Sequence, residues 1–172
     1  MFAGKPPCET DTLWRELEES EAFDILRRRF PLLTALHRPP SVARDFIGVL
    51  QVNPKRMRRG IIKTLLLATS AVMPRLKYII CVDDDIDIYN LTDVMWAVAT
   101  RCDPKDDVAS VDGTMTSWLD PSSGGLTGKL FFDTTKKEGF RGQMPEYPEE
   151  SMVRARKAIE TARALASHVA SN

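Results

Sequence analysis

The sequence predicts an α/β fold in which a mixed sheet is flanked by helices. Three observations support this class. Helix-like and strand-like stretches alternate along the 172 residues. Residues 77–82 are dominated by a continuous apolar run, which is typical of a strand buried on both faces of a parallel sheet. Between residues 54 and 73, apolar residues recur at helical spacing and basic residues occupy the opposite arc.

The first 30 residues are expected to form a linker and a helical segment. The stretch Gly4-Lys5-Pro6-Pro7 cannot lie inside a helix, because proline lacks the backbone donor that a helix interior needs. Residues 11–19 are predicted to be helical. Ser20 is expected to cap a second helical stretch, which Pro31 ends.

An α/β domain is expected over residues 31–148. Its first strands are predicted at 32–36 and 45–52, where apolar residues gather between breaker residues. Pro54 suits the first turn of the next helix, which is expected to end near residue 73. The predicted buried arc of that helix consists of Met57, Ile61, Leu65, Ala68 and Val72.

The rest of this domain is expected to contain the apolar strand, a helix capped by Asn90, and strands at 108–111 and 130–133. The polar, glycine-bearing stretch 113–128 is expected to be a long loop between the last two strands. A final helix is predicted within residues 149–172. The expected order is therefore α–β–β–α–β–α–β–β–α.

Composition argues against several classes of protein. Lys plus Arg and Asp plus Glu both number 24, whereas a general nucleic-acid binder carries a basic excess. No stretch approaches the roughly 20 apolar residues that a membrane span needs, and no secretory signal is evident. The 3 cysteines lack metal-ligand spacing and indicate a reduced, cytoplasmic compartment. We therefore expect no nucleic-acid partner and no membrane partner.

Four carboxylates follow the apolar strand in the run Asp83-Asp84-Asp85-Ile86-Asp87. Ligands of open α/β sheets collect at the carboxyl ends of strands. Carboxylates this close together also repel one another unless a positive group lies among them. The run is therefore either a metal or substrate site built on Asp83, Asp85 and Asp87, or a capping and salt-bridge cluster with a basic side chain such as Arg101. The residues leave both interpretations open.

The stretch Gly124-Gly125-Leu126-Thr127-Gly128-Lys129 superficially resembles a phosphate-binding loop. Two required residues are missing, because Ser123 stands at the first glycine position and Leu130 at the final Ser or Thr position. A strand is also expected after the stretch, whereas the phosphate-binding motif opens a helix. Lys129 remains a candidate for binding a phosphate or carboxylate as a point charge. The plainer interpretation is an exposed lysine.

Several motifs together resemble the UbiD family of prenylated-flavin decarboxylases. The strongest resemblance covers residues 78–104, where the aspartate run is followed by Trp96-Ala97, Thr100-Arg101 and Asp103-Pro104 in the family's order. Further similar stretches lie at residues 4–7, 36–40, 119–122 and 128–135. The resemblance implies the fold of the family's carboxyl-terminal α/β domain, a mixed sheet flanked by helices.

This resemblance implies one part of an enzyme. The family reversibly decarboxylates aromatic or α,β-unsaturated acids with prenylated FMN, a divalent metal and potassium. Its catalytic residues and metal ligands lie in an upstream domain that the resemblance does not cover, so none is expected here. One cofactor contact is expected at Lys129, because the family's lysine in that segment reaches towards the flavin. The family's metal is held elsewhere, which favours the structural interpretation of the aspartate run.

The leading hypothesis is a C-terminal domain or subunit of a UbiD-type carboxy-lyase that is active only with a flavin-binding partner. The resemblance also implies that the helix in residues 149–172 contacts a neighbouring subunit in a homo- or hetero-oligomer. Two alternatives stay open. One is a non-catalytic assembly or scaffold protein derived from this domain. The other is a metal-dependent transferase that uses the aspartate run.

Overall fold

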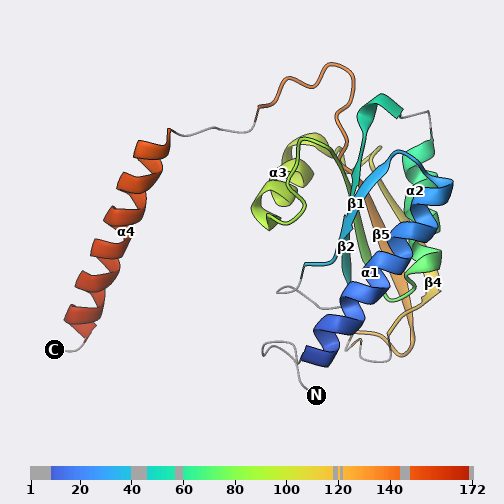
Figure 1. The fold of residues 1–172 in the computed structure, drawn as a ribbon, viewed down its shortest axis with the longest axis horizontal. Coiled ribbons are helices and arrows are strands. Elements are labelled where there is room, and N and C mark those ends of the chain that lie inside the picture. Colours follow the sequence, from blue (N-terminus) through green and yellow to red (C-terminus); the bar gives the residue numbers. More distant parts are fainter. Residues whose placement is uncertain are drawn as a thin grey trace. The chain divides into compact units, whose positions relative to one another are not determined.

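The computed structural model describes residues 9–39, 46–56, 60–117, 120, 122–143 and 148–170. The chain divides into two compact units, and the boundary along the sequence lies between Phe140 and Arg141. The first contains a five-stranded sheet with helices on both faces (Figure 1), and the second contains one helix, α4 (Glu149–Ala170). In this described part of the chain, no helix combines the length and apolar character that crossing a bilayer requires.

The sheet is mixed, as predicted. Its strand order is β1-β2-β3-β5-β4, with β2, β3 and β5 parallel and the two outer pairs antiparallel. The carboxyl ends of β2, β3 and β5 therefore share one edge of the sheet. The strands are β1 (Leu33–His37), β2 (Ile47–Val52), β3 (Tyr78–Asp83), β4 (Val108–Met115) and β5 (Leu126–Asp133).

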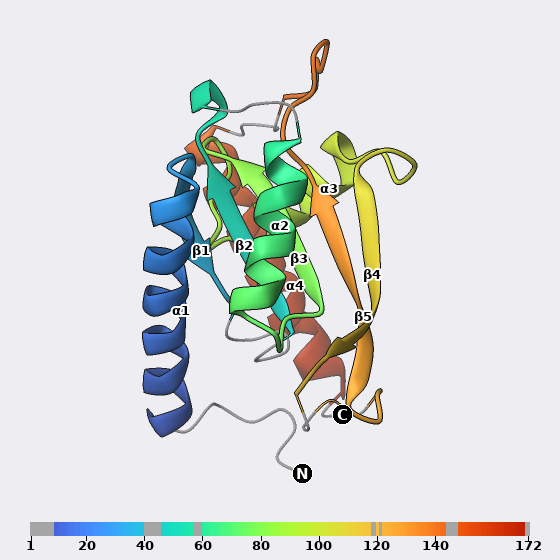
Figure 2. The ribbon, with the colours of Figure 1, turned by 90° about the vertical axis from the view of Figure 1, so that its right-hand side faces the viewer.

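Helices cover the two faces of this sheet unequally. Figure 2 shows α1 (Glu9–Arg29) and α2 (Ile61–Val72) in front of the sheet and α3 (Leu91–Arg101) on the opposite face. The main core lies beneath α1 and α2, and each fully buried Leu or Ile side chain there contributes about 1.5–3 kcal/mol. Its central members are Leu26, Leu50, Leu65, Ile79 and Phe131.

The predicted break at Ser20 is wrong, because residues 9–29 form one continuous helix. Ser20 is exposed on this helix. Serine inside a helix costs only about 0.5 kcal/mol relative to alanine. Ala22, Leu26 and the following Phe30 are buried at intervals of four residues, and their packing outweighs that cost. The predicted linker at residues 4–7 and Cys8 lie outside the described residues.

The predicted helix from Pro54 is also wrong in its start. Pro54–Arg56 form only a single 3₁₀ turn, and α2 begins at Ile61 after Gly60, whose φ of 77° is left-handed. The buried side chains of α2 are Ile62, Leu65, Leu66 and Thr69, so the predicted arc is displaced by about one residue. Contact with α1 as well as the sheet explains why two adjacent leucines are buried. Met57 of the predicted arc is outside the described residues.

Strands β4 and β5 extend into the predicted 113–128 loop. Their pairing shifts register between Val111 and Thr114, and Gly113 has a φ of 68° there. Glycine at this position permits an irregularity within a strand pair, whereas the sequence pattern suggested the start of a loop. The predicted cap of α3 is confirmed, because the Asn90 side chain accepts a hydrogen bond from the backbone N–H of Thr92 at 3.1 Å.

Replacement of Gly48 by alanine should destabilise the first unit. Gly48 lies in β2, and a Cβ atom there would stand 2.7 Å from Cδ1 of Leu76, which is itself buried. We expect Gly48→Ala to lower the free energy of unfolding by about 1–3 kcal/mol in urea titrations. Gly124→Ala is the matched control, since its Cβ meets no atom within 4 Å. Equal stability of the two variants would contradict this packing.

Candidate functional site

The aspartate run meets Arg101 at the carboxyl end of β3. Arg101, the last residue of α3, donates to both carboxylate oxygens of Asp85, at 2.9 Å from Nη1 and 2.7 Å from Nη2. Its Nη1 also lies 3.7 Å from Oδ2 of Asp83. The guanidinium also lies over the rings of Trp96 and Phe140, whose centroids are 5.0 and 5.4 Å from its carbon atom. The arginine therefore joins the helix, the strand end and the segment around residue 140.

Lys136 completes the group, here called the Arg101 cluster (Asp83, Asp85, Arg101 and Lys136). Its ammonium lies 2.9 Å from Oδ2 of Asp85, and its backbone N–H donates to Oδ2 of Asp83 at 2.6 Å. Two carboxylates thus meet two cations. Hydrogen bonds from Arg101 lower the pKa of Asp85 to about 2, whereas burial raises the pKa of Asp83.

The other members of the run do not join this cluster. Asp87 accepts a hydrogen bond from the backbone N–H of Tyr89 at 2.9 Å, and Asp84 is exposed. Among the residues that the structure describes, no three His, Cys, Asp or Glu side chains are placed to hold a metal ion. The geometry therefore favours capping and salt bridges, because a guanidinium already supplies the positive charge that the carboxylates require.

Sequence reasoning also missed two ion pairs that Lys137 forms. Lys137 places its ammonium 3.2 Å from carboxylate oxygens of both Asp107 and Asp133. These aspartates lie just before β4 and at the end of β5. The only sequence signal was the Lys136-Lys137 pair that follows a strand ending in aspartate. That pair does not reveal which distant carboxylate it would meet.

Lys129 lies away from the Arg101 cluster and is buried. Its ammonium donates to the carbonyl oxygens of Pro74 and Leu76, at 2.6 Å in each case. Burial lowers the pKa of Lys129, because the charged form loses water. The plainer expectation of an exposed lysine is wrong. Its expected contact with a flavin stays a prediction.

Nearby, the Lys77 ammonium pairs with the Asp120 carboxylate at 3.1 Å. It also donates to the Ser122 hydroxyl at 2.6 Å. The backbone N–H of Ser122 and the Lys77 ammonium together hold the pKa of Asp120 well below its usual range.

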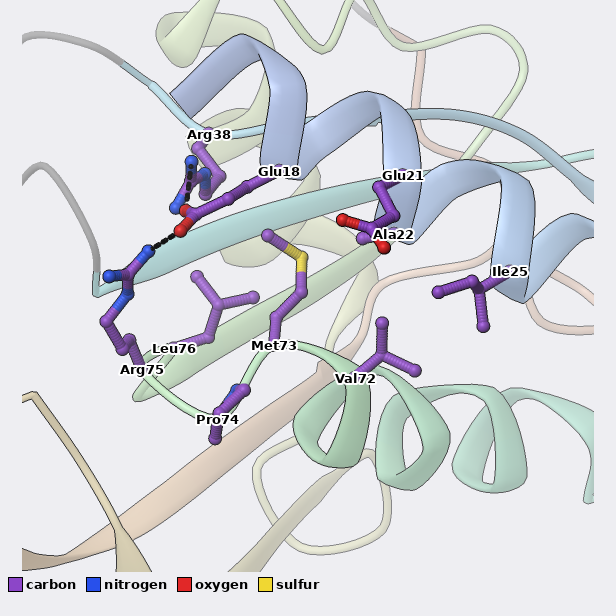
Figure 3. A pocket seen from close by; sticks show the side chains of 10 residues that line it. All are labelled: Glu18, Glu21, Ala22, Ile25, Arg38, Val72, Met73, Pro74, Arg75 and Leu76. Carbon is purple, nitrogen blue, oxygen red and sulfur yellow. Dashed lines mark hydrogen bonds and ion pairs between the residues drawn. The ribbon is translucent and has the colours of Figure 1, made fainter. Parts of the chain in front are cut away.

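A cavity of about 330 Å³ lies between α1 and the end of α2, and Figure 3 shows its lining. We call it the α1–α2 pocket. At one end Glu18 forms ion pairs with Arg75 and with Arg38, the latter at 3.1 Å. The sequence did not suggest this pocket, because its walls come from segments about 50 residues apart. Its lining consists of Glu18, Glu21, Ala22, Ile25, Arg38, Val72, Met73, Pro74, Arg75 and Leu76.

Removal of the Arg101 guanidinium should destabilise the first unit. Arg101→Met keeps much of the side-chain volume but leaves the buried Asp83 without its cation. We expect a loss of about 3 kcal/mol in urea unfolding, at the low end for a buried pair because the Asp85 side chain is 39% exposed. Lys136→Met is the control, and its 48% exposed side chain should contribute less than about 1 kcal/mol. Equal losses would argue against a central role for Arg101.

The two carboxylates of the cluster should act oppositely in the pH dependence of stability. The pKa of Asp85 is about 2 in the fold against an ordinary 3.8, so its contribution is complete above about pH 4 and lost as pH falls towards 2. Asp83, with its raised pKa, instead weakens the fold as pH rises through that pKa. Asp85→Asn should therefore flatten the loss of stability between about pH 4 and 2. Asp84→Asn is the matched control in these urea titrations, because it replaces an exposed aspartate of the same run that lies outside the Arg101 cluster.

Solved structures similar to this chain include a UbiD-class enzyme and two decarboxylases. The UbiD-class enzyme HmfF from Pelotomaculum thermopropionicum, in complex with FMN, is 28% identical with a TM-score of 0.72; the match covers 81% of this chain and 32% of HmfF. Vanillic acid decarboxylase from Sedimentibacter hydroxybenzoicus is 26% identical with a TM-score of 0.60, over 80% and 31% of the two chains. The 3,4-dihydroxybenzoic acid decarboxylase AroY of Klebsiella pneumoniae, 24% identical with a TM-score of 0.68 over 84% and 33%, shares the fold.

The chain thus spans about one third of the length of these solved proteins. A family described as the 3-octaprenyl-4-hydroxybenzoate carboxy-lyase C-terminal domain matches residues 11–134. This range begins in α1 and ends just after β5, so it contains all five strands and the Arg101 and Asp85 pair. The chain therefore belongs to the UbiD carboxy-lyase C-terminal domain family.

Proposed function

We propose that this chain works as the C-terminal part of a UbiD-type carboxy-lyase that acts on an aromatic or α,β-unsaturated acid. The observation that carries the proposal is that its match to UbiD-class enzymes is confined to about a third of their length. A flavin-binding partner, either a subunit or a domain, supplies the rest in this proposal. HmfF, solved with FMN and in an evolved dimeric form with prenylated FMN, supports the class of cofactor.

The described residues do not fit a complete flavin and metal site. A flavin phosphate and its metal would need free cations and carboxylates. The basic side chains of the Arg101 cluster are instead paired with Asp83 and Asp85, and the buried Lys129 ammonium is bonded to two carbonyl oxygens. We therefore assign no chemical step to these residues. The proposed role of the chain is to form one wall of a pocket that the partner completes.

Lys129 keeps its proposed role as the flavin contact within that wall. Its ammonium now satisfies the carbonyl oxygens of Pro74 and Leu76. For a direct contact with a flavin, the Lys129 ammonium would have to leave these carbonyl oxygens, so residues 74–76 would have to move. A buried ammonium needs hydrogen-bond acceptors, which the flavin would then have to provide.

Helix α4 offers a candidate subunit contact both for the carboxy-lyase and for the alternative, an assembly protein. Met152, Val153 and Ile159 of α4 are 37%, 53% and 52% exposed. Exposed apolar residues on one helix are typical of a subunit contact. We accordingly propose that residues 149–172 contact a neighbouring subunit under either function. We also propose that the protein is cytoplasmic.

The isolated chain should bind FMN poorly. We expect no saturable quenching of FMN fluorescence at micromolar concentrations of the chain, because the basic groups of the Arg101 cluster and the Lys129 ammonium already have partners within the fold. HmfF freed of its flavin is the positive control, as it is solved with FMN. Micromolar or tighter binding by the isolated chain would contradict the need for a partner.

Affinity capture of the tagged full chain from its own cells tests the partner directly. We expect it to retain a flavin-binding polypeptide, identified by mass spectrometry and by flavin absorbance in the eluate. Native mass spectrometry then separates the two functions. A hetero-oligomer that contains flavin supports the carboxy-lyase, whereas a homo-oligomer without such a polypeptide supports the assembly protein.

A further inference from the structure

Helix α1 carries apolar side chains on two opposite sides. One side packs on the sheet through Ala22 and Leu26. The other side, which we call the outer face of α1, falls within about 120° of the helix circumference at 3.6 residues per turn. It consists of Leu13, Trp14, Leu17 and Ile25, which are 62%, 63%, 62% and 49% exposed.

A helix on a protein surface needs only one apolar stripe, and a helix that is apolar on both sides is normally covered on both. Single exposed leucines are ordinary. Four large exposed apolar side chains lie on one arc of this helix, where charged residues such as Glu21 and Asp24 are interleaved with them, and together they indicate an interaction surface. The outer face is therefore expected to be covered in the working assembly.

The α1–α2 pocket adjoins this face, because Ile25 belongs to both. Figure 3 shows Glu21 and Ile25 projecting from α1 on the side where Val72 and Met73 lie. Glu18 is engaged by Arg38 and Arg75, whereas no described residue pairs with the Glu21 carboxylate. A lysine or arginine side chain of a partner fits this place. Its methylene groups would lie along the apolar wall of the pocket, and its charged end would contact Glu21, as is common for partly buried lysine and arginine side chains.

The charge of Glu21 bears on whether a second copy of this chain is the occupant. Two α1 helices that cross at the turn of Glu21 would bring the Glu21 carboxylates of both copies close together. Like charges at such a contact disfavour the pairing. The surface instead fits a partner that offers an apolar patch with a basic side chain beside it.

The comparisons favour the flavin-binding part of the enzyme as that partner. The family domain is a C-terminal one, and its match begins at residue 11, within α1. In the longer relatives the remainder of the chain therefore lies mainly before the counterpart of α1. Elements that follow one another along a chain usually lie next to one another in space. We propose that the outer face of α1 and the α1–α2 pocket are the docking surface for the flavin-binding partner, an inference that rests on the proposed function.

Binding of the captured flavin-binding polypeptide to variants of the full chain tests this surface. We expect Trp14→Ser combined with Leu17→Ser to weaken the affinity at least tenfold in calorimetric titrations, because the variant lacks two apolar side chains that the partner would bury. Glu21→Gln should weaken it several-fold at low salt, with a smaller effect at high salt. Circular dichroism should show unchanged folding, since all three positions are exposed.

Matched controls lie on other surfaces. Met95→Ser removes a side chain that is 50% exposed on α3, and Glu16→Gln removes an exposed carboxylate from a different arc of α1. Both should bind like the wild type. A photo-crosslinking residue at position 17 should join the chain to the flavin-binding polypeptide, and the same residue at position 95 should not.

The outcomes separate the two proposals. If the wild-type chain binds the polypeptide and the Trp14 and Leu17 variant binds equally well, the docking surface is overturned while the proposed function stands. The surface is also overturned if position 17 crosslinks to a second copy of this chain. If the wild-type chain captures no flavin-binding polypeptide, the proposed function fails and the docking surface fails with it.

Discussion

The contact of Arg101 with Asp83, at the end of β3, and with Asp85 is the interaction on which the first unit most depends. The carboxyl edge of a parallel sheet collects charge, and here Asp83 is buried at that edge. A buried carboxylate is tolerated only when a partner compensates its lost hydration. Arg101 supplies that partner and orients α3, while its guanidinium lies over the rings of Trp96 and Phe140. One side chain thus links strand, helix and the segment that ends the unit.

Other buried cations follow the same principle and explain why the described residues offer little chemistry of their own. Lys129 is held by two carbonyl oxygens, and Arg38 contacts the Arg15 carbonyl oxygen and Glu18. A charged group that is already paired in the fold is costly to redirect towards a substrate, because its structural partner would be left unsatisfied. Reactivity in this fold is therefore expected at surfaces where the unit meets another polypeptide.

Much of the fold could be predicted from sequence, because burial and helix capping leave local signals in it. The continuous apolar run that forms β3 and the Asn90 cap are two such signals. The start of α2 could not be predicted in this way, because both Pro54 and Gly60 are residues that commonly stand at a helix start, and only the second marks the start of α2. The sequence alone did not decide between a metal and Arg101 as the partner of the aspartate run, and it did not indicate the α1–α2 pocket. Two segments that are far apart along the chain but close in space carry no local sequence signal of that closeness.

The two-sided α1 connects the fold to the proposed function. Its inner side belongs to the core, so the helix is rigidly placed without any partner. A rigid helix presents Trp14 and Leu17 at a defined spacing and loses little conformational entropy when a partner covers them. Such a surface favours association through preorganised apolar contact, with Glu21 contributing selectivity by charge. The same helix can therefore stabilise the isolated unit and determine where the remaining two thirds of a carboxy-lyase would dock.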